Sequence, residues 1–306
     1  MRTRPSRLVP GDTVAVVAPA GPVPEELLTE GVRLLRGWGL DVRVGEHVLD
    51  RHEVFGYLAG SDADRAADLQ RAWCDPAVSA VLGARGGYGC LRVLDHVDWA
   101  AMRAAGPKVF AGSSDLTAVH DAFAAHLDVV TLFAPMIGSA AFTGDPVAAE
   151  HLRRTLFEPD SVRVLTRPGA GALVGGRCTG FTSGGNASLV VSALGAHDAP
   201  PPPRGAVVLL EDVTEEPYRL DRILTQLLRA GWFEGVAGIA LGSWSRCGDL
   251  ADVRALMADR LGGLGVPVVW ELGFGHCPGQ LTVPLGVAAE LDADAGTLTC
   301  VLPALL

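Results

Sequence analysis

The sequence lacks the features that would point to a nucleic acid or a membrane as partner. Lys108 is the only lysine among the 25 lysines and arginines, and the net charge at pH 7 is −10. A chain this acidic is expected to bind neither nucleic acid nor an anionic membrane surface. No segment approaches the run of about 18 apolar residues that a membrane-spanning helix needs. We therefore expect a small-molecule or peptide partner.

The cysteines are few, and none of them lie at the spacing of a paired motif. The six cysteines form no C-x-x-C pair and no metal-ligand pattern; they are Cys74, Cys90, Cys178, Cys247, Cys277 and Cys300. This pattern favours a reducing, cytoplasmic setting without structural zinc or another metal.

The composition is that of a globular protein with one large or two smaller domains. Of the 306 residues, 49% are hydrophobic and 20% are charged, which is far from a disordered composition. Strand-like apolar runs in the first half alternate with helical patterns that begin near Pro24 and Ser61; the runs cover residues 13–18, 40–44, 78–84, 107–112 and 128–133. This alternation predicts an α/β fold with a largely parallel sheet.

The periodicity breaks in the glycine- and proline-rich stretch around 159–176, where we place a domain boundary. Residues 1–160 are predicted to form a Rossmann- or flavodoxin-like parallel-sheet domain and 161–176 a linker. Residues 177–306 are predicted to form a smaller α/β domain of mixed strands. It would contain an amphipathic helix at 219–228 and strands at 206–211, 236–242, 267–272, 287–293 and 297–303.

Two polar segments follow predicted strands of the first domain. The segment RGGYG, here called the glycine loop (Arg85–Gly89), follows one strand, and Ser113 and Ser114 follow another. Ligands on parallel sheets bind at the carboxyl ends of the strands. Either serine could cap the next helix, or one could be a nucleophile on a sharp strand-to-helix turn, a nucleophile elbow.

A serine nucleophile needs a base, a group that orients the base, and backbone N–H donors for the oxyanion. Glu211 ends an apolar strand, where a carboxylate needs a partner, and His276 lies in the glycine-bracketed loop GFGHCPG. Loop histidines such as His151 are expected to be solvated, and His120, in a helical pattern, is interpreted as scaffold. Gly86 or Gly87 could bring a backbone N–H close to a ligand.

Eight segments in order resemble the LD-carboxypeptidases, serine peptidases that trim murein tetrapeptides, and the related microcin C immunity peptidases. They run from GDTVAVVAPAGP through YLAGSDADRAADL, DPAVSAVLGARGGYG, PKVFAGSSDLTAV, GGNASLV, LLEDVTEEPYRLDRIL and AGIALGSWSRC to GFGHCPGQLTVPLG. The resemblance implies a triad of Ser114 as nucleophile, His276 as base and Glu211 as orienting carboxylate. It also implies oxyanion donors at the backbone of Asp115 and of Gly86 or Gly87, and leaves Ser113 to pack or cap.

The implied activity is hydrolysis of the L,D-amide bond that releases the C-terminal D-alanine of a murein tetrapeptide during cell-wall recycling. No cofactor is expected, and a homodimer is anticipated. The alternatives are an immunity-type peptidase acting on aminoacyl-nucleotide conjugates and a non-catalytic binding module. An aromatic platform for a nucleotide is expected in the first of these, and residues 134–176 offer only Phe142 and Phe157.

Two positions depart from the family pattern: Ser113 replaces a frequent bulky aromatic residue, and FAPM stands at 133–136. Both bear on substrate preference. A carboxypeptidase must also recognise a free carboxylate, and a bidentate arginine suits that group. Arg85, directly before the glycine turn, is the best-placed candidate, although bracing that turn is an equally good interpretation. Arg222 and Arg246 are held in reserve.

Overall fold

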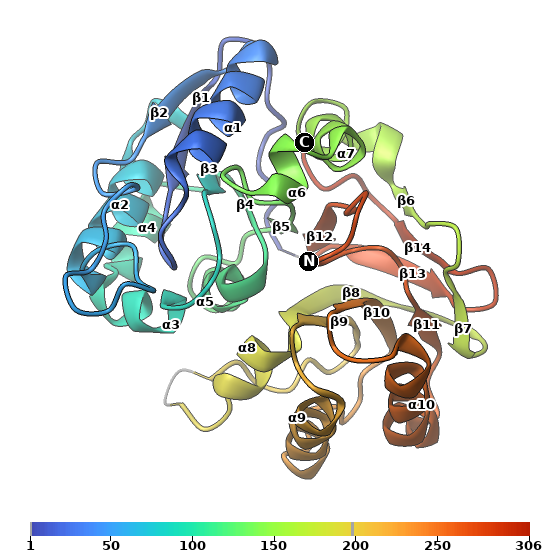
Figure 1. Ribbon diagram of the computed structural model, residues 1–306. Helices are drawn as coiled ribbons and strands as arrows, with labels where there is room; N and C mark the ends of the chain where they lie inside the picture. The colour runs from blue at the N-terminus through green and yellow to red at the C-terminus, as the bar shows by residue number, and fades with distance from the viewer. Residues whose placement is uncertain (1, 197–198) are drawn as a thin grey trace.

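The computed structural model describes residues 2–196 and 199–306 and contains two β-sheets (Figure 1). The first sheet has five parallel strands and one antiparallel edge strand, in the order β12 (Val283–Leu285), β5 (Thr131–Phe133), β4 (Val109–Gly112), β3 (Val78–Gly83), β1 (Thr13–Val17) and β2 (Asp41–Val44). The predicted α/β class with a parallel first sheet is confirmed.

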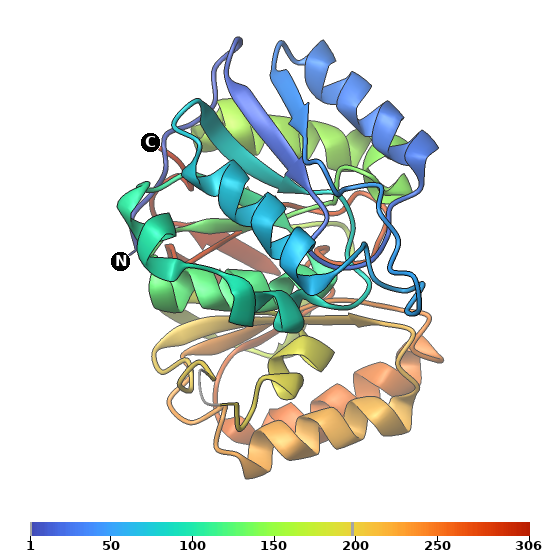
Figure 2. The ribbon, with the colours of Figure 1, turned by 90° about the vertical axis from the view of Figure 1, so that its left-hand side faces the viewer.

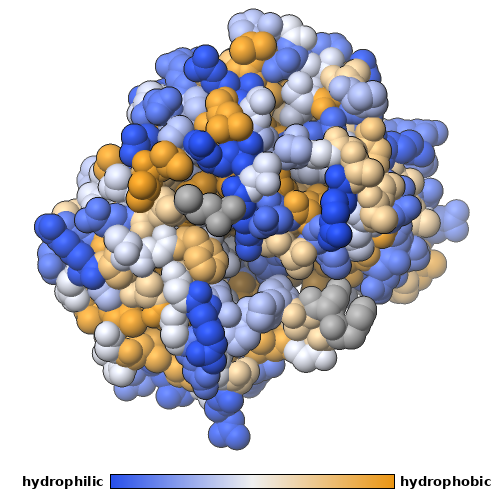
Figure 3. Space-filling view, turned by 180° about the vertical axis from the view of Figure 1, so that it is seen from behind, coloured by the Kyte–Doolittle hydropathy of each residue, from blue (hydrophilic) through white to orange (hydrophobic). Residues whose placement is uncertain are grey.

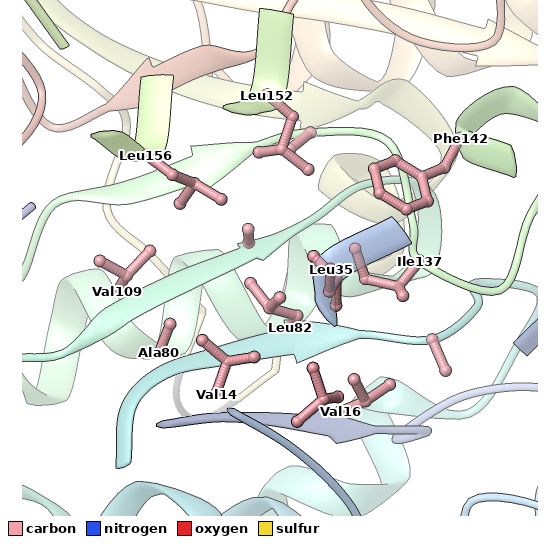
Figure 4. Packing of buried hydrophobic residues seen from close by; sticks show 14 of the residues in the cluster. Val14, Val16, Leu35, Ala80, Leu82, Val109, Ile137, Phe142, Leu152 and Leu156 are labelled. Atoms are coloured by element: carbon pink, nitrogen blue, oxygen red, sulfur yellow. The ribbon is translucent and has the colours of Figure 1, made fainter. Parts of the chain in front are cut away.

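Helices cover both faces of the first sheet. One face packs on α1 (Glu25–Gly37), α6 (Ala140–Thr143) and α7 (Pro146–Phe157), and the other on α2 (Asp62–Cys74), α3 (Cys90–Val93), α4 (Trp99–Ala104) and α5 (Thr117–His126). Figure 4 shows the first of these interfaces, where Leu35, Phe142 and Leu152 lie over the strand residues. Short 3-10 turns stand at Leu94–His96, Ser114–Leu116, Pro159–Val162 and Gly262–Leu264.

Local sequence signals explain where two of these helices form. In α1 the buried residues Leu28, Val32 and Leu35 recur at the spacing of one helical face. The helix α2 begins after Ser61, whose hydroxyl oxygen accepts the backbone N–H of Asp64 at 3.1 Å.

The second sheet is mixed, with a parallel centre and antiparallel edges. Its order is β6 (Val164–Leu165), β14 (Thr297–Cys300), β13 (Ala288–Asp292), β8 (Arg177–Asn186), β9 (Ala206–Val213), β10 (Gly238–Ser245), β11 (Val268–Trp270) and β7 (Gly171–Val174). One face is covered by α8 (Ala187–Ser192), α9 (Pro217–Arg229) and α10 (Leu250–Leu261). Figure 2 shows α9 and α10 lying side by side on this outer face.

Four strands lie where the sequence indicated none. The central strand β8 carries Gly180, Gly184 and Gly185, which interrupt any apolar pattern. A side chain at Gly184 would collide with the backbone of Leu209 on β9, so the close pairing of the two strands requires glycine. The strands β6 and β7 form within the stretch interpreted as a linker, and β12 is only three residues long.

The two sheets share a hydrophobic core. Strand β12 comes late in the chain yet pairs with β5 of the first sheet, joining Val283 to Phe133. Both residues pack in one buried cluster with Leu209 and Leu291 of the second sheet. The two chain ends also meet, since the backbone N–H of Leu306 donates to the Pro5 carbonyl at 2.9 Å. The boundaries 1–160 and 177–306 stay a prediction.

The surface of the described residues is mixed in hydropathy in the view from behind. There, hydrophilic residues are interspersed with small hydrophobic groups (Figure 3). Among the helices of residues 2–196 and 199–306, none is long and apolar enough to cross a membrane.

Candidate active site

Ser114 occupies a strained turn between β4 and α5. Its φ of 59° lies in the left-handed region, a conformation that costs a non-glycine residue about 1–3 kcal/mol and occurs mainly at functional sites. Leu116 packs where side chains at Gly83 and Gly112 would otherwise lie, which lets the chain turn sharply. The geometry is that of a nucleophile elbow.

Ser113 does not cap the helix that follows. Its side chain makes no capping hydrogen bond, its φ of −148° is extended, and it is buried. Ser113 therefore packs beneath the turn, which leaves Ser114 as the residue set in the strained conformation.

His120 supports the turn from below. Its Nε2 lies 2.9 Å from the Gly112 carbonyl oxygen and must donate to it, while Nδ1 lies 2.8 Å from the Thr131 hydroxyl. Burial lowers the pKa of His120 to about 4, so the ring is neutral at physiological pH. This histidine is scaffold.

His151 differs from the sequence-based expectation. Burial lowers its pKa to about 4 as well, and its Nδ1 accepts the backbone N–H of Thr282 at 3.0 Å. The prediction of a solvated ring was wrong, because the ring ties α7 to the segment before β12.

The glycine loop lies directly against Ser114. A Cβ atom placed on Gly86 would stand 2.9 Å from the Cβ and 3.1 Å from the Oγ of Ser114. Gly87 has a φ of 109°, which favours glycine. Within the described residues, the backbone N–H groups of Gly86 and Gly87 donate to no backbone carbonyl, so they are available to a ligand.

Glu211 and His276 form a tight pair. Glu211 is fully buried at the carboxyl end of the apolar part of β9, and its Oε2 lies 2.7 Å from His276 Nδ1. The same oxygen accepts the backbone N–H of His276 at 3.3 Å. A side chain at Gly275, with a φ of 88°, would collide with this carboxylate. The buried carboxylate therefore has the partner that its position required.

Asn186 connects the Glu211–His276 pair to the elbow helix. Its amide nitrogen donates to Glu211 Oε1 at 3.2 Å and to Asp212 Oδ1 at 3.0 Å, and its amide oxygen caps α8. Its backbone N–H donates to Thr117 Oγ1 at 3.0 Å. Thr117 begins α5, three residues after Ser114, so Asn186 links the position of the Glu211 carboxylate to that of Ser114.

Sequence analysis did not single out Asn186. The available signal was an asparagine after two glycines and before an apolar helical run, which indicates an N-cap. Nothing local to that motif reveals its bonds to carboxylates 25 and 26 residues away.

The environment of His276 makes it a stronger base than a free histidine. Burial lowers its pKa, but the charge of Glu211 and the hydrogen bond to it outweigh burial, with a further contribution from Asp212, so the net pKa is raised. Because Nδ1 is held by Glu211, Nε2 is the nitrogen left to exchange protons. No hydrogen bond joins His276 to Ser114 in the described part of the chain; such catalytic contacts often tighten only when substrate binds.

The three candidate arginines have different surroundings. Arg85 is exposed, and its Nη1 donates to the Pro22 carbonyl at 2.7 Å. Arg246 is exposed with a φ of 58°, and its charge acts to lower the pKa of His276, which places it near the imidazole. Arg222 lies over the ring of Tyr218 at 5.5 Å.

The described residues contain no group of three histidine, cysteine or carboxylate side chains that could hold a metal ion. The chemistry that the arrangement offers is nucleophilic, through Ser114, Glu211 and His276.

Both halves of the sequence match domain families. The sequence profile of the LD-carboxypeptidase N-terminal domain matches residues 14–134 and that of the C-terminal domain matches residues 179–291. A Streptomyces coelicolor protein whose name assigns it carboxypeptidase activity only provisionally is 62% identical over 302 residues, covering 99% of this chain and 97% of that one. The murein tetrapeptide carboxypeptidase of Pseudomonas aeruginosa is 31% identical over 297 residues, covering 92% and 93%.

Solved structures show the same fold. The muramoyltetrapeptide carboxypeptidase from Oxalobacter formigenes superposes with a TM-score of 0.79 at 30% identity, covering 94% of this chain and 97% of that one. A microcin C7 self-immunity protein gives a TM-score of 0.86 at 21% identity, covering 99% and 100%, and this likeness bears on the fold alone.

Proposed function

The chain belongs to the LD-carboxypeptidase family, and on that premise we propose that it is a serine carboxypeptidase that releases the C-terminal D-alanine of murein tetrapeptides during cytoplasmic cell-wall recycling. One observation carries the proposal: a serine strained to a φ of 59° lies against Gly86, in a molecule that also pairs a buried carboxylate with a histidine at 2.7 Å. Strain of this kind clusters at active sites.

In the proposed mechanism, the Ser114 hydroxyl attacks the scissile carbonyl carbon and its proton passes to His276 Nε2. Glu211 holds the Nδ1–H and stabilises the imidazolium that forms. The backbone N–H of Asp115 and that of Gly86 or Gly87 bind the oxyanion. His276 then protonates the leaving amine of D-alanine, and water, activated by the same histidine, hydrolyses the acyl-enzyme.

The surroundings of the two phenylalanines at 134–176 support a murein peptide over a nucleotide conjugate. Phe142 is fully buried, and both it and Phe157 form perpendicular ring pairs with Trp38 in the first core. An exposed aromatic pair does exist elsewhere: Tyr88 lies in the glycine loop, and its ring centroid is 5.6 Å from that of Tyr57. Both substrates therefore belong in the test.

The test incubates the purified chain with murein tetrapeptide and, in parallel, with an aminoacyl-adenylate analogue, and identifies products by mass. We expect release of D-alanine from the tetrapeptide and little cleavage of the analogue. The opposite preference would assign the immunity-type activity, and no cleavage of either would favour a binding module.

Ser114→Ala is expected to abolish this activity while the protein stays folded. Loss of such a nucleophile costs on the order of 10⁶-fold in kcat. Ser113→Ala is the matched control, since it removes the adjacent hydroxyl, which makes no capping bond, and it should retain most activity. If Ser113→Ala were the inactive variant, the nucleophile would be misassigned.

A further inference from the structure

Arg65 is a buried cation in the first turn of α2, outside the proposed triad. It is 1% exposed, and burying a guanidinium costs several kcal/mol unless its hydrogen bonds are met. Its Nη2 contacts Asp62 Oδ1, and its Nη1 donates to two backbone carbonyls, those of Pro19 and, at 3.0 Å, Gly89. The position of this charge calls for an explanation beyond helix stability.

The two carbonyls belong to two neighbouring loops, one of which lies against Ser114. Pro19 lies in the loop after β1, and Gly89 ends the glycine loop after β3. The loops are also joined to each other, since the backbone N–H of Gly21 donates to the Gly86 carbonyl at 3.0 Å. Gly86 in turn lies against Ser114. Arg65 therefore donates hydrogen bonds to both loops and ties them together.

The opposite side of the same peptide is held by Asp115. The carbonyl of Gly89 and the N–H of Cys90 form one peptide group; Arg65 binds the carbonyl, and Asp115 Oδ2 accepts the N–H at 2.7 Å. Asp115 is itself 2% exposed and directly follows the nucleophile. A side chain at Gly89 would stand 2.6 Å from Arg65 Nη1 and 2.7 Å from Leu58. Arg65 therefore holds the carbonyl side of this peptide and Asp115 its N–H side, while Leu58 packs against Gly89.

We infer that Arg65 and the Asp115 carboxylate are positioning residues that clamp the Gly89–Cys90 peptide and so set the distance between the glycine loop and the Ser114 elbow. This inference rests on the proposed function, because its effect is to place the loop's oxyanion donor opposite the Asp115 N–H. The buried charge is also compensated, since Asp62 neutralises Arg65 with one oxygen and binds Arg92 with the other at 2.7 and 3.0 Å.

The first test is Arg65→Lys. Lysine keeps the charge but lacks the planar fork that reaches Asp62 and two carbonyls together. We expect kcat on the tetrapeptide to fall by about 10²-fold, the scale of losing one oxyanion donor, with KM nearly unchanged. A boronic-acid analogue of the tetrapeptide, which bonds Ser114 and presents an oxygen to the same donors, should lose affinity by a similar factor.

Arg92→Gln is the matched control. Arg92 binds the same Asp62 but is partly exposed and contacts neither loop carbonyl. Its kcat should stay within about twofold of wild type, as for most surface substitutions. An equal loss in both variants, or a loss of Arg65→Lys that appears in KM alone, would overturn the positioning role.

Asp115 provides a second, independent pair of variants should Arg65→Lys fail to fold. Asp115→Asn keeps an oxygen that can accept the Cys90 N–H, whereas Asp115→Ala removes it. We expect Asp115→Ala to lower both kcat and the affinity for the boronate. Asp115→Asn should retain most of both. Equal activities in the two would contradict the clamp.

A label for the serine separates this inference from the proposed function. A fluorophosphonate forms a bond between its phosphorus and Ser114 Oγ, expels fluoride, and places its phosphoryl oxygen on the oxyanion donors. If the wild-type protein is labelled but releases no D-alanine, the proposed substrate is wrong. The clamp can still be tested in that case, because the rate of fluorophosphonate labelling can be compared between variants. Slower labelling of Arg65→Lys than of Arg92→Gln supports the clamp; equal rates refute it.

Discussion

At the scale of single residues, the base is the feature that most directly governs pH dependence. In the proposed mechanism His276 must be neutral to accept the Ser114 proton, and its pKa is raised. Activity should therefore fall with decreasing pH, with a midpoint in kcat/KM above the ordinary histidine value of about 6.5. A pH–rate profile of the wild type measures this, and a flat profile between pH 5 and 8 would count against a histidine base.

Glu211→Gln should change that profile in a defined direction. The substitution removes the charge that raises the pKa of His276 but leaves burial, which lowers it. The acid midpoint should move to lower pH while kcat drops by about 10⁴-fold, as for other orienting carboxylates. If the acid midpoint of the residual activity stayed unchanged, a group other than His276 would be responsible for the fall in activity at acid pH.

Arg85 offers a test of how the enzyme recognises a chain end. If its guanidinium binds the substrate carboxylate, Arg85→Lys should lose most kcat/KM on the free-acid tetrapeptide and little on its C-terminal amide. The present contact with the Pro22 carbonyl supplies the competing role of a loop brace. Equal losses on both substrates would favour the brace and turn attention to Arg246, whose charge acts on His276.

At the scale of elements, one hydrogen bond joins the start of α5 to the end of β8. Thr117→Val keeps the side-chain shape but leaves the buried N–H of Asn186 without its acceptor. We expect a loss of about 1–3 kcal/mol in the free energy of unfolding, together with a fall in kcat because Asn186 also holds Glu211.

Thr155→Val is the control for that prediction. Thr155 is equally buried, and its hydroxyl bonds only the His151 carbonyl within α7. Urea unfolding and tetrapeptide turnover of both variants make the comparison. If the two behave alike in turnover, the Thr117–Asn186 bond does not serve the site.

Sequence patterns predicted elements well where a single local rule governs them. The buried parallel strands β1, β3 and β9 are continuous apolar runs, and α2 has its serine cap. Strand β8 was missed because close backbone pairing selects glycine there rather than an apolar side chain. The bonds of Asn186 and Arg65 were missed for a related reason: their partners are distant in sequence, and no local period encodes them.

At the scale of the whole molecule, the first domain is incomplete without the second half of the chain. The segment 1–160 lacks β12, which covers the edge of β5 and the fully buried Phe133. Expressed alone, this segment should be insoluble or only partly folded, because an uncovered apolar edge strand promotes association. Soluble yield and near-ultraviolet circular dichroism decide the point; a soluble, cooperatively unfolding fragment would validate the boundary at 160.

The pairing of β12 with β5 also has a consequence for the order of events during synthesis. A ribosome emits residues at about 5–20 per second, so Ser114 emerges many seconds before Val283 can reach Phe133. Until then the nascent chain holds Ser114 on an unfinished sheet, and for nearly all of that interval His276 has yet to be made. The proposed triad is therefore complete only late in synthesis, and a chain terminated before His276 should be inert toward its own cell's peptides.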